Sequence, residues 1–313
     1  MLDTNDPDVE RRWRALWDAS PQRSPFSQLK YVRYAAEAAG LHAGVFFADA
    51  DAGGAAITWR RHGPYREIIV PPFTPFSAIL LRDVPAEPDV HAGNTALGEL
   101  LRTLERPFHA LRLHLHPSLA DVRPAQWAGW SAEPLYTYVC STPGTDGWSE
   151  SVLRNFRNAR NDYVFVEDRS ASAAAVRLAE ASYARHDRSP PLSANSLGGL
   201  VNRLTASGLA SAFAVRHKSS DEIHAAVVIL NDGRTAYYWI AGSRPGDGMT
   251  VLIGELLPRL FNQGIELFDF MGANTPGIAE FKRKFGARLV PYFALTRCRE
   301  DLTLLRTLRN MWR

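Results

Sequence analysis

A basic run near the C-terminus, Phe281-Lys282-Arg283-Lys284-Phe285-Gly286, has residue types suited to holding an anion. A lysine ammonium there would bind a phosphate or stabilise the charge that develops on an acyl carbonyl under attack. Asp269 lies earlier, between two phenylalanines of a strand-like stretch, and points to the face opposite both rings. A carboxylate near an amine accepts its proton as a general base, especially where burial raises its pKa. The alternatives are a solvated basic face for Lys282 and a structural acceptor, for backbone amides or Arg283, for Asp269.

The stretch that carries these residues has a counterpart earlier in the chain. Phe108–Cys140 aligns without a gap with Ile265–Arg297, and both read as an alternating strand, a polar loop, a short helix, a glycine and a strand entered through a proline. The offset is half of the 313 residues, which predicts a duplicated domain. Asp269 and Lys282 align with an arginine and an alanine, so the second copy is expected to carry the site.

Turn-forming residues at 141–147 predict a linker near the middle of the chain. We therefore expect an N-terminal domain over residues 1–147, structural or substrate-binding, and a catalytic domain over residues 148–313. Several antiparallel strands followed by a helix, a strand, a helix and a last strand predict an α+β fold, with helices flanking a mixed, mostly antiparallel sheet. The pattern predicts helices over 7–19, 29–40, 149–161 and 249–262, and a hairpin turn at 231–233.

Composition excludes several classes of protein. Apolar residues at 46% and charged residues at 22% are typical of a globular chain. The N-terminus has no apolar segment of a secretory signal, and prolines interrupt the most apolar run, 68–81, so no membrane span is expected. Cys140 and Cys298 suit neither a disulfide framework nor a zinc site, and we expect a soluble, cytoplasmic protein. Formal charge is −3 over residues 1–147 and +6 over 148–313, which favours a phosphate-bearing ligand in the second half.

Other candidate residues are less specific. Arg154, Arg157 and Arg160 recur every three residues on one arc of a helix, where guanidinium groups would clamp a diphosphate or an RNA backbone. A solvated helix face is the alternative. His186 at a helix end is a candidate base, although a lone histidine near a cap is more often incidental. His114 and His116 share one face of a strand, but no third ligand is evident nearby, and no metal is expected.

The order of these motifs resembles the Fem-type (FemABX-like) acyltransferases, which are tandem-domain members of the GNAT superfamily. The resemblance rests on seven features in order: Ser24-Pro25-Phe26-Ser27, the basic helix 153–160, the hairpin, Tyr237-Tyr238-Trp239-Ile240, the long helix, Phe268-Asp269-Phe270-Met271-Gly272, and the Phe-Lys run. It covers most of the chain. The resemblance implies two tandem GNAT-like domains and direct attack of an amine on a bound acyl ester or thioester, without a covalent enzyme intermediate.

The resemblance also implies roles for individual residues. Lys282 matches the lysine of the family's Phe-Lys motif, and Tyr238 falls among the substrate-binding positions. Tyr31 is the nearest equivalent of a tryptophan in the opening motif. Tyr34 stands where a phosphate-binding lysine is expected, with Lys30 close by, so Lys30 and Tyr34 are also candidate substrate-binding residues.

The donor is left open between two kinds of co-substrate. GNAT enzymes hold the CoA pyrophosphate on backbone amides at a helix start, and here the equivalent segment reads Arg244-Pro245-Gly246-Asp247-Gly248-Met249. Arg244, Gly246 and Gly248 are therefore candidate cofactor-binding residues, although a plain turn is the alternative because Asp247 would repel phosphate. The peptidoglycan-bridge relatives take their acyl group from aminoacyl-tRNA instead.

These features together predict an enzyme, an N-acyltransferase. We expect it to move an acyl group from an acyl-CoA-type donor to an amine of a sugar, peptide or small molecule, with no tightly bound cofactor. One alternative is aminoacyl-tRNA-dependent transfer onto a peptidoglycan precursor or peptide, with tRNA as a partner. Another is a non-catalytic protein that binds a phosphorylated ligand. The sequence leaves the acceptor and the oligomeric state open.

Overall fold

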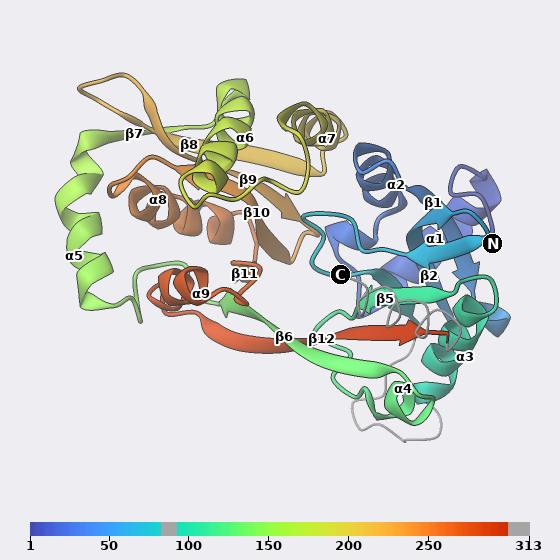
Figure 1. The fold of residues 1–313 in the computed structure, drawn as a ribbon. Coiled ribbons are helices and arrows are strands. Elements are labelled where there is room, and N and C mark those ends of the chain that lie inside the picture. The colour runs from blue at the N-terminus through green and yellow to red at the C-terminus, as the bar shows by residue number, and fades with distance from the viewer. Residues whose placement is uncertain (83–92, 300–313) are drawn as a thin grey trace, which may run out of the picture. The chain divides into compact units, whose positions relative to one another are not determined.

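The chain divides into two units, each with its own hydrophobic core. The computed structural model describes residues 1–82 and 93–299 (Figure 1). Unit 1 comprises Met1–Leu135 and the chain from Pro291, and unit 2 comprises Tyr136–Val290. This division differs from a single cut after residue 147, because the chain passes between the units twice, within β6 (Ser131–Cys140) and within β12 (Arg288–Cys298). In the described ranges, no helix is both long and apolar enough to cross a membrane.

Unit 1 is an α+β layer. Its sheet has the order β1 (His42–Phe47), β2 (Gly53–His62), β3 (Tyr65–Ile68), β5 (Ala110–His114) and β12, and β4 (Ala78–Leu81) pairs with the first half of β2. Its helices are α1 (Pro7–Ala19), α2 (Leu29–Ala38), α3 (Gly93–Glu105) and α4 (Arg123–Trp127), with 3-10 turns at Pro25–Ser27 and Asp49–Asp51.

The first helix shows how local sequence sets these elements. The Asp6 carboxylate accepts the N–H of Asp8, and Pro7 occupies the first turn, where a missing N–H costs nothing. Val9, Trp13 and Leu16 then recur at helical spacing and are buried. The result is an amphipathic helix whose bounds are those expected from the sequence.

Unit 2 carries the remaining strands, in the order β6, β11 (Leu267–Asp269), β10 (Thr235–Ser243), β9 (Ile223–Asn231), β8 (Ala210–His217) and β7 (Tyr163–Val166). Its helices are α5 (Glu150–Ala159), α6 (Arg169–Ala184), α7 (Ala194–Ala206), α8 (Gly248–Asn262) and α9 (Pro276–Arg283), with a 3-10 turn at Arg160–Asp162. Helix α6 packs on one face of β8–β10 and α8 packs on the other, where it joins α5 in the main core (Figure 1).

Two glycines allow the layers of unit 2 to approach closely. A Cβ on Gly242 of β10 would lie 2.2 Å from the backbone carbonyl carbon of Leu178 in α6. A Cβ on Gly254 of α8 would lie 2.4 Å from the ring of Phe156 in α5. The contact of the sheet with α6 and that of α8 with α5 therefore both depend on a missing side chain.

The two units repeat the same closing elements. Adding 157 to the first residue of β5, Ala110, gives Leu267, where β11 begins, and adding it to Ser131 of β6 gives Arg288, where β12 begins. The predicted duplication is therefore seen in the positions of the strands. Each closing strand pairs with a strand from the other half of the chain, since β6 pairs with β11 and β12 pairs with β5.

Candidate functional site

Strands β10 and β11 of unit 2 separate soon after they meet. Their parallel pairing is confined to Thr235–Tyr237 against Leu267–Asp269. Strand β10 continues to Ser243 with a bulge between Tyr238 and Ile240, and beyond that pairing its β11-facing edge has no strand partner in the part of the chain that the structure describes. The opening therefore offers backbone donors and acceptors to an extended ligand.

Asp269 lies at the end of β11, where the two strands separate. Its side chain is 3% exposed, and it accepts hydrogen bonds from the Thr137 hydroxyl and from the Met271 N–H, the latter at 2.6 Å. Burial raises the pKa of Asp269 to about 6, although the two hydrogen bonds and the charge of Lys282 act in the opposite direction. A carboxylate with a raised pKa is a group that exchanges protons near neutral pH.

Lys282 in α9 approaches the same turn from the other side. Its ammonium, in a residue 8% exposed, donates to the carbonyl oxygens of Met271 and, at 2.8 Å, Gly272. Both of these residues have positive φ, 55° and 35°, so they form a left-handed turn whose two carbonyls meet the ammonium. Burial lowers the pKa of Lys282 to about 8, and the charge of Asp269 partly opposes this shift.

These contacts give Asp269 and Lys282 a shared structural role. They hold the turn at Met271 and Gly272 through its amide and its two carbonyls. The sequence offered two structural partners for Asp269, which were backbone amides and Arg283. Asp269 accepts a backbone N–H, whereas Arg283 pairs with Glu280 at 3.0 Å. Because an ammonium has three N–H groups and two are used here, one donor of Lys282 is left for a ligand.

Tyr238 connects this turn with the start of α8. The Lys282 ammonium lies 5.9 Å from the centroid of the Tyr238 ring, and the ring packs against Phe270 with the centroids 6.0 Å apart. Its hydroxyl donates to the Met249 sulfur at 3.1 Å, a weak acceptor, and burial raises the pKa of this hydroxyl. The tyrosine therefore places a poorly satisfied donor between Lys282 and α8.

The loop before α8 has the form of an anion site with a carboxylate in it. The amides of Gly248–Thr250 lie in the first turn of α8, where the helix itself offers them no hydrogen-bond acceptor. The helix dipole also favours negative charge there. Asp247 precedes them and accepts a hydrogen bond from the Asn155 side chain at 3.0 Å. Arg244 pairs with Glu222 at 3.1 Å, and Gly246 has a φ of 116° that favours glycine.

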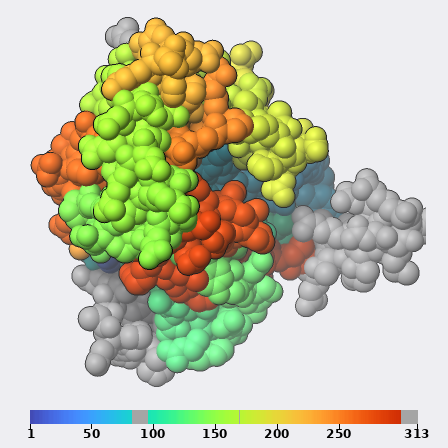
Figure 2. Space-filling model, turned by 90° about the vertical axis from the view of Figure 1, so that its left-hand side faces the viewer, coloured from blue at the N-terminus to red at the C-terminus, as the bar shows by residue number. Residues whose placement is uncertain are grey.

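The basic residues of α5 lie on one face of unit 2. Figure 2, in which α5 is green, shows this helix at the surface. Arg154 and Arg157 are exposed and, among the described residues, make no ion pair, whereas Arg160 pairs with Glu255 at 3.4 Å. Phe156 is buried on the opposite side of the helix. Two of the three predicted arginines are therefore available to a ligand.

Lys30 and Tyr34, the predicted substrate-binding residues of the N-terminal half, both lie on α2 of unit 1. Lys30 is exposed and Tyr34 is half-buried. Tyr31 between them is buried, and its hydroxyl shares a hydrogen bond of 2.9 Å with the Thr74 hydroxyl. These residues belong to a different unit from Asp269 and Lys282.

The remaining candidates do not join the site. Burial lowers the pKa of His114 and of His116 to about 4, and both lie in unit 1. Within residues 1–82 and 93–299, no group of three or more His, Cys, Asp or Glu is arranged to hold a metal ion. His186 is exposed beyond the end of α6. Cys140 and Cys298 are free thiols, the first of them buried.

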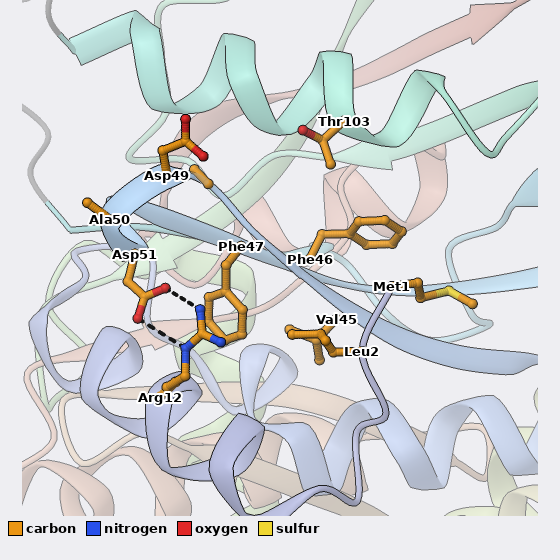
Figure 3. A pocket seen from close by; sticks show the side chains of 11 residues that line it. Met1, Leu2, Arg12, Val45, Phe46, Phe47, Asp49, Ala50, Asp51 and Thr103 are labelled. Carbon is orange, nitrogen blue, oxygen red and sulfur yellow. Dashed lines mark hydrogen bonds and ion pairs between the residues drawn. The ribbon is translucent and has the colours of Figure 1, made fainter.

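An open pocket of about 710 Å³ lies in unit 1, and none of the predicted site residues lines it (Figure 3). Arg12 and Asp51 form a two-pronged ion pair at one end, with distances of 3.2 and 2.5 Å. This pair lowers the pKa of Asp51 and joins α1 to the turn between β1 and β2. We therefore assign the pair to the structure of unit 1.

Sequence reasoning missed the residues that complete the site in space. Thr137 and Asn155 bond to Asp269 and Asp247, which are 132 and 92 positions away along the chain. Met249 lies under the Tyr238 hydroxyl. No short motif connects such partners, although Thr137 is on β6, a strand that the repeat itself predicts.

The strand opening, the glycine-containing helix start and the two α+β units with matching closing strands are features of the GNAT fold. Residues 150–283 match the family described as acetyltransferase (GNAT) domain. That match covers α5 to α9 and includes Asp269, Lys282 and the loop before α8. An acyl donor and an amine acceptor are the co-substrates that such a domain implies.

Solved structures extend the likeness over both units. The chain is similar to FemX, with a TM-score of 0.69 and 10% identity, covering 91% of this chain and 95% of that one. It is also similar to L-PGS from Bacillus licheniformis (TM-score 0.58, 11% identity, 99% and 98% covered) and to a tandem GNAT protein from the clavulanic acid biosynthesis pathway (0.57, 13%, 94% and 96%). A comparison with curated proteins found no match. The predicted tandem GNAT-like fold of the Fem type is confirmed.

Proposed function

We propose that unit 2 transfers an acyl group from an acyl-CoA-type donor to an amine of a sugar, peptide or small molecule. The observation that carries the proposal is the opening between β10 and β11, with α8 at one end and the buried ammonium of Lys282 at the other. An extended donor lying along the open edge of β10 would direct its phosphates to the first turn of α8 and its acyl group toward Lys282.

In this proposal the acceptor nitrogen attacks the acyl carbonyl directly. A C–N bond forms, the C–S bond of the thioester breaks, and the thiol leaves with the electron pair. Lys282 donates its third N–H to the carbonyl oxygen as negative charge develops there. Asp269 takes the proton that the amine releases, as its raised pKa permits.

Calorimetric titration with acetyl-CoA, whose acyl carbonyl contacts Lys282 in this proposal, tests the donor. We expect a single site of roughly micromolar affinity in the wild type and weaker binding in Lys282→Ala, with Lys284→Ala on the same helix as the control. Lys284 is ion-paired with Glu280 at 3.4 Å and belongs to the exposed basic face. No heat at millimolar acetyl-CoA would contradict the acyl-CoA donor.

The Asp247 carboxylate, in the loop before α8, gives a second and sharper test. Asp247→Asn removes one negative charge beside the α8 amides and keeps an acceptor for Asn155. CoA affinity should rise roughly tenfold at low salt, because a like charge no longer opposes the phosphates, and the gain should shrink as salt screens the loop. The exposed Glu150→Gln carries the same charge change elsewhere on unit 2 and should leave affinity unchanged. Equal affinities for Asp247→Asn and the wild type would place the phosphates elsewhere.

Transfer from aminoacyl-tRNA is the second candidate, and the free guanidinium groups of Arg154 and Arg157 favour it. A polyanion contacts exposed, unpaired arginines readily, and each phosphate contact contributes to the salt dependence of binding. Charge reversal of both residues to glutamate should weaken tRNA binding roughly tenfold or more and lower its salt slope by about two. Arg123→Glu, an exposed arginine of unit 1 that is paired with Asp121, is the control. Binding of tRNA that is unchanged by both substitutions would contradict aminoacyl-tRNA as the donor.

The proposed acceptor is an amine of a sugar, a peptide or a peptidoglycan precursor, and Tyr238 of unit 2 is its proposed contact. Turnover separates this enzyme from a non-catalytic protein that binds a phosphorylated ligand. Release of thiol from acetyl-CoA in the presence of a panel of amines would support the enzyme. Tight binding without release under any of these conditions would support the binding protein.

A further inference from the structure

Two stacked histidines lie at the end of the β8–β9 hairpin in unit 2. The rings of His217 and His224 are 4.8 Å apart and nearly parallel, with an angle of 21° between their planes. Tyr163, the first residue of β7, meets both rings edge-on, and its hydroxyl lies 3.2 Å from Nδ1 of His224. The Ser219 hydroxyl lies 2.9 Å from Nδ1 of His217. The pair is therefore held in a defined geometry.

This cluster supports the loop before α8. The His224 carbonyl accepts the N–H of Arg244 at 2.8 Å, and a Cβ on Gly248 would lie 3.1 Å from the His224 Cβ. Glu222, two residues before His224, pairs with the Arg244 side chain. The charge of Asp247 helps to raise the pKa of Tyr163, so the hydroxyl lies within electrostatic reach of the loop. The loop thus rests on the histidine cluster through its main chain and its side chains.

We propose that His224 and Tyr163 are positioning residues for the loop Arg244–Gly248, and that a proton gained by His224 loosens this loop and weakens donor binding. The effect on donor binding rests on the proposed function, in which this loop is the site for the donor phosphates. The loop's dependence on His224 does not require any donor.

The chemistry of the imidazole gives the direction of the effect. A neutral His224 with its hydrogen on Nε2 accepts the Tyr163 hydroxyl hydrogen at Nδ1, whereas the Nδ1–H of a protonated ring donates to the hydroxyl oxygen, so that the Tyr163 hydroxyl hydrogen must turn to another acceptor. The proton also places a second cation beside Arg244, whereas the charge of Glu222 acts in the opposite direction. Burial, then His217, then Arg244 lower the pKa of His224 below its ordinary 6.5. The arrangement is therefore complete above pH 6.5 and is lost as pH falls through the lower folded value.

Hydrogen exchange in the free protein tests the positioning directly. The amides of Arg244 and Val251 are the probes, since they bond to the His224 and Asp247 carbonyls. After correction for intrinsic rates, their protection in the wild type should fall roughly threefold from pH 7.5 to 5.5, because a lowered folded pKa and an ordinary value of 6.5 in the open loop limit the linkage. His224→Asn keeps an acceptor near Nδ1 without a titrating group and should stay protected at both values. Tyr163→Phe should be unprotected at both, and His186→Asn should behave as the wild type.

CoA titration at the same two pH values tests the link to the donor. Affinity should fall roughly threefold on acidification in the wild type and stay constant in His224→Asn, because the donor binds the form of the protein in which His224 is neutral. Unchanged protection of the wild-type loop, or a His224→Asn variant that follows the wild type, would overturn the proposal. Tighter CoA binding at pH 5.5 would also overturn it. Absence of CoA binding in every variant would count against the proposed donor, while the exchange data would still decide the positioning role.

Discussion

Replacing Lys282 with methionine should lower the rate of acyl transfer by roughly 100-fold to 1,000-fold, the usual effect of losing one donor to a developing oxyanion. Methionine keeps the length and much of the volume of the side chain but removes all three N–H groups. The carbonyls of Met271 and Gly272 then lose their donor in a buried turn, so the free energy of unfolding should also fall by about 2 kcal/mol.

The matched control is Lys284→Met on the same helix. Lys284 is more exposed and ion-paired with Glu280, so the same change of side chain should cost under about 0.5 kcal/mol and leave the rate unchanged. Rates are followed as thiol release from acetyl-CoA with an accepted amine, and stability is followed by urea unfolding. A Lys282→Met variant that loses stability but keeps its rate would reduce Lys282 to its structural role.

The pH profile gives the same hypothesis a second readout. Burial raises the pKa of Asp269 to about 6, so the proposed base is ionised above that value. Burial lowers the pKa of Lys282 to about 8, so the proposed donor is charged below that value. The rate should follow a bell with limbs near pH 6 and 8, and Asp269→Asn should remove the acid limb along with most of the rate. A flat profile across this range would contradict both roles.

The same shifts have opposite consequences for stability. The raised pKa of Asp269 gives a contribution that is present below its ordinary value of 3.8 and is lost as pH rises through about 6. The lowered pKa of Lys282 gives a contribution that is present above 10.5 and is lost as pH falls through about 8. Between these values both groups are charged and buried, and the hydrogen bonds of the turn offset that cost.

Much of the fold follows from local patterns in the sequence. Helix α1 has the predicted bounds, and the predicted hairpin at Asn231–Gly233 joins β9 and β10. The offset of 157 residues places β11 and β12 from β5 and β6, because strand alternation and the proline entry survive duplication. β4 escaped prediction, since it has four residues and follows a segment with three prolines.

The arrangement of the site lies beyond such patterns. An alternating strand shows which of its faces is apolar but does not identify its neighbour, so the sequences of β6 and β12 do not show that each pairs with a strand from the other half of the chain. The hydrogen bond between Thr137 and Asp269 depends on that pairing. The stacked histidines likewise come from two strands and meet only through the register of the hairpin.

Gly286→Ala should lower the free energy of unfolding by about 3 kcal/mol, the sum of a left-handed backbone and a clash. Gly286 has a φ of 70°, and a Cβ there would lie 2.9 Å from the backbone carbon of Gly147 at the end of the linker. The neighbouring contacts show what this approach achieves. The Ser149 N–H bonds to the Lys284 carbonyl at 2.9 Å, and Trp148 packs edge-on against Phe285. The linker and the start of α5 are thus docked on the turn that ends α9.

Gly208→Ala separates the clash from the backbone cost. Gly208 follows α7 with a φ of 75° and has nothing within 4 Å of an added Cβ, so alanine there should cost only about 1 kcal/mol. Urea unfolding gives the loss of unfolding free energy for each variant. The difference between the losses in Gly286→Ala and in Gly208→Ala measures the cost of the clash where the two glycine backbones approach closely. Because Gly286 comes four residues after Lys282, a shift of this turn should also lower the transfer rate, whereas Gly208→Ala should not. Equal losses of stability would mean that the linker moves away from α9 without cost, and that α5 is positioned by its contact with α8 alone.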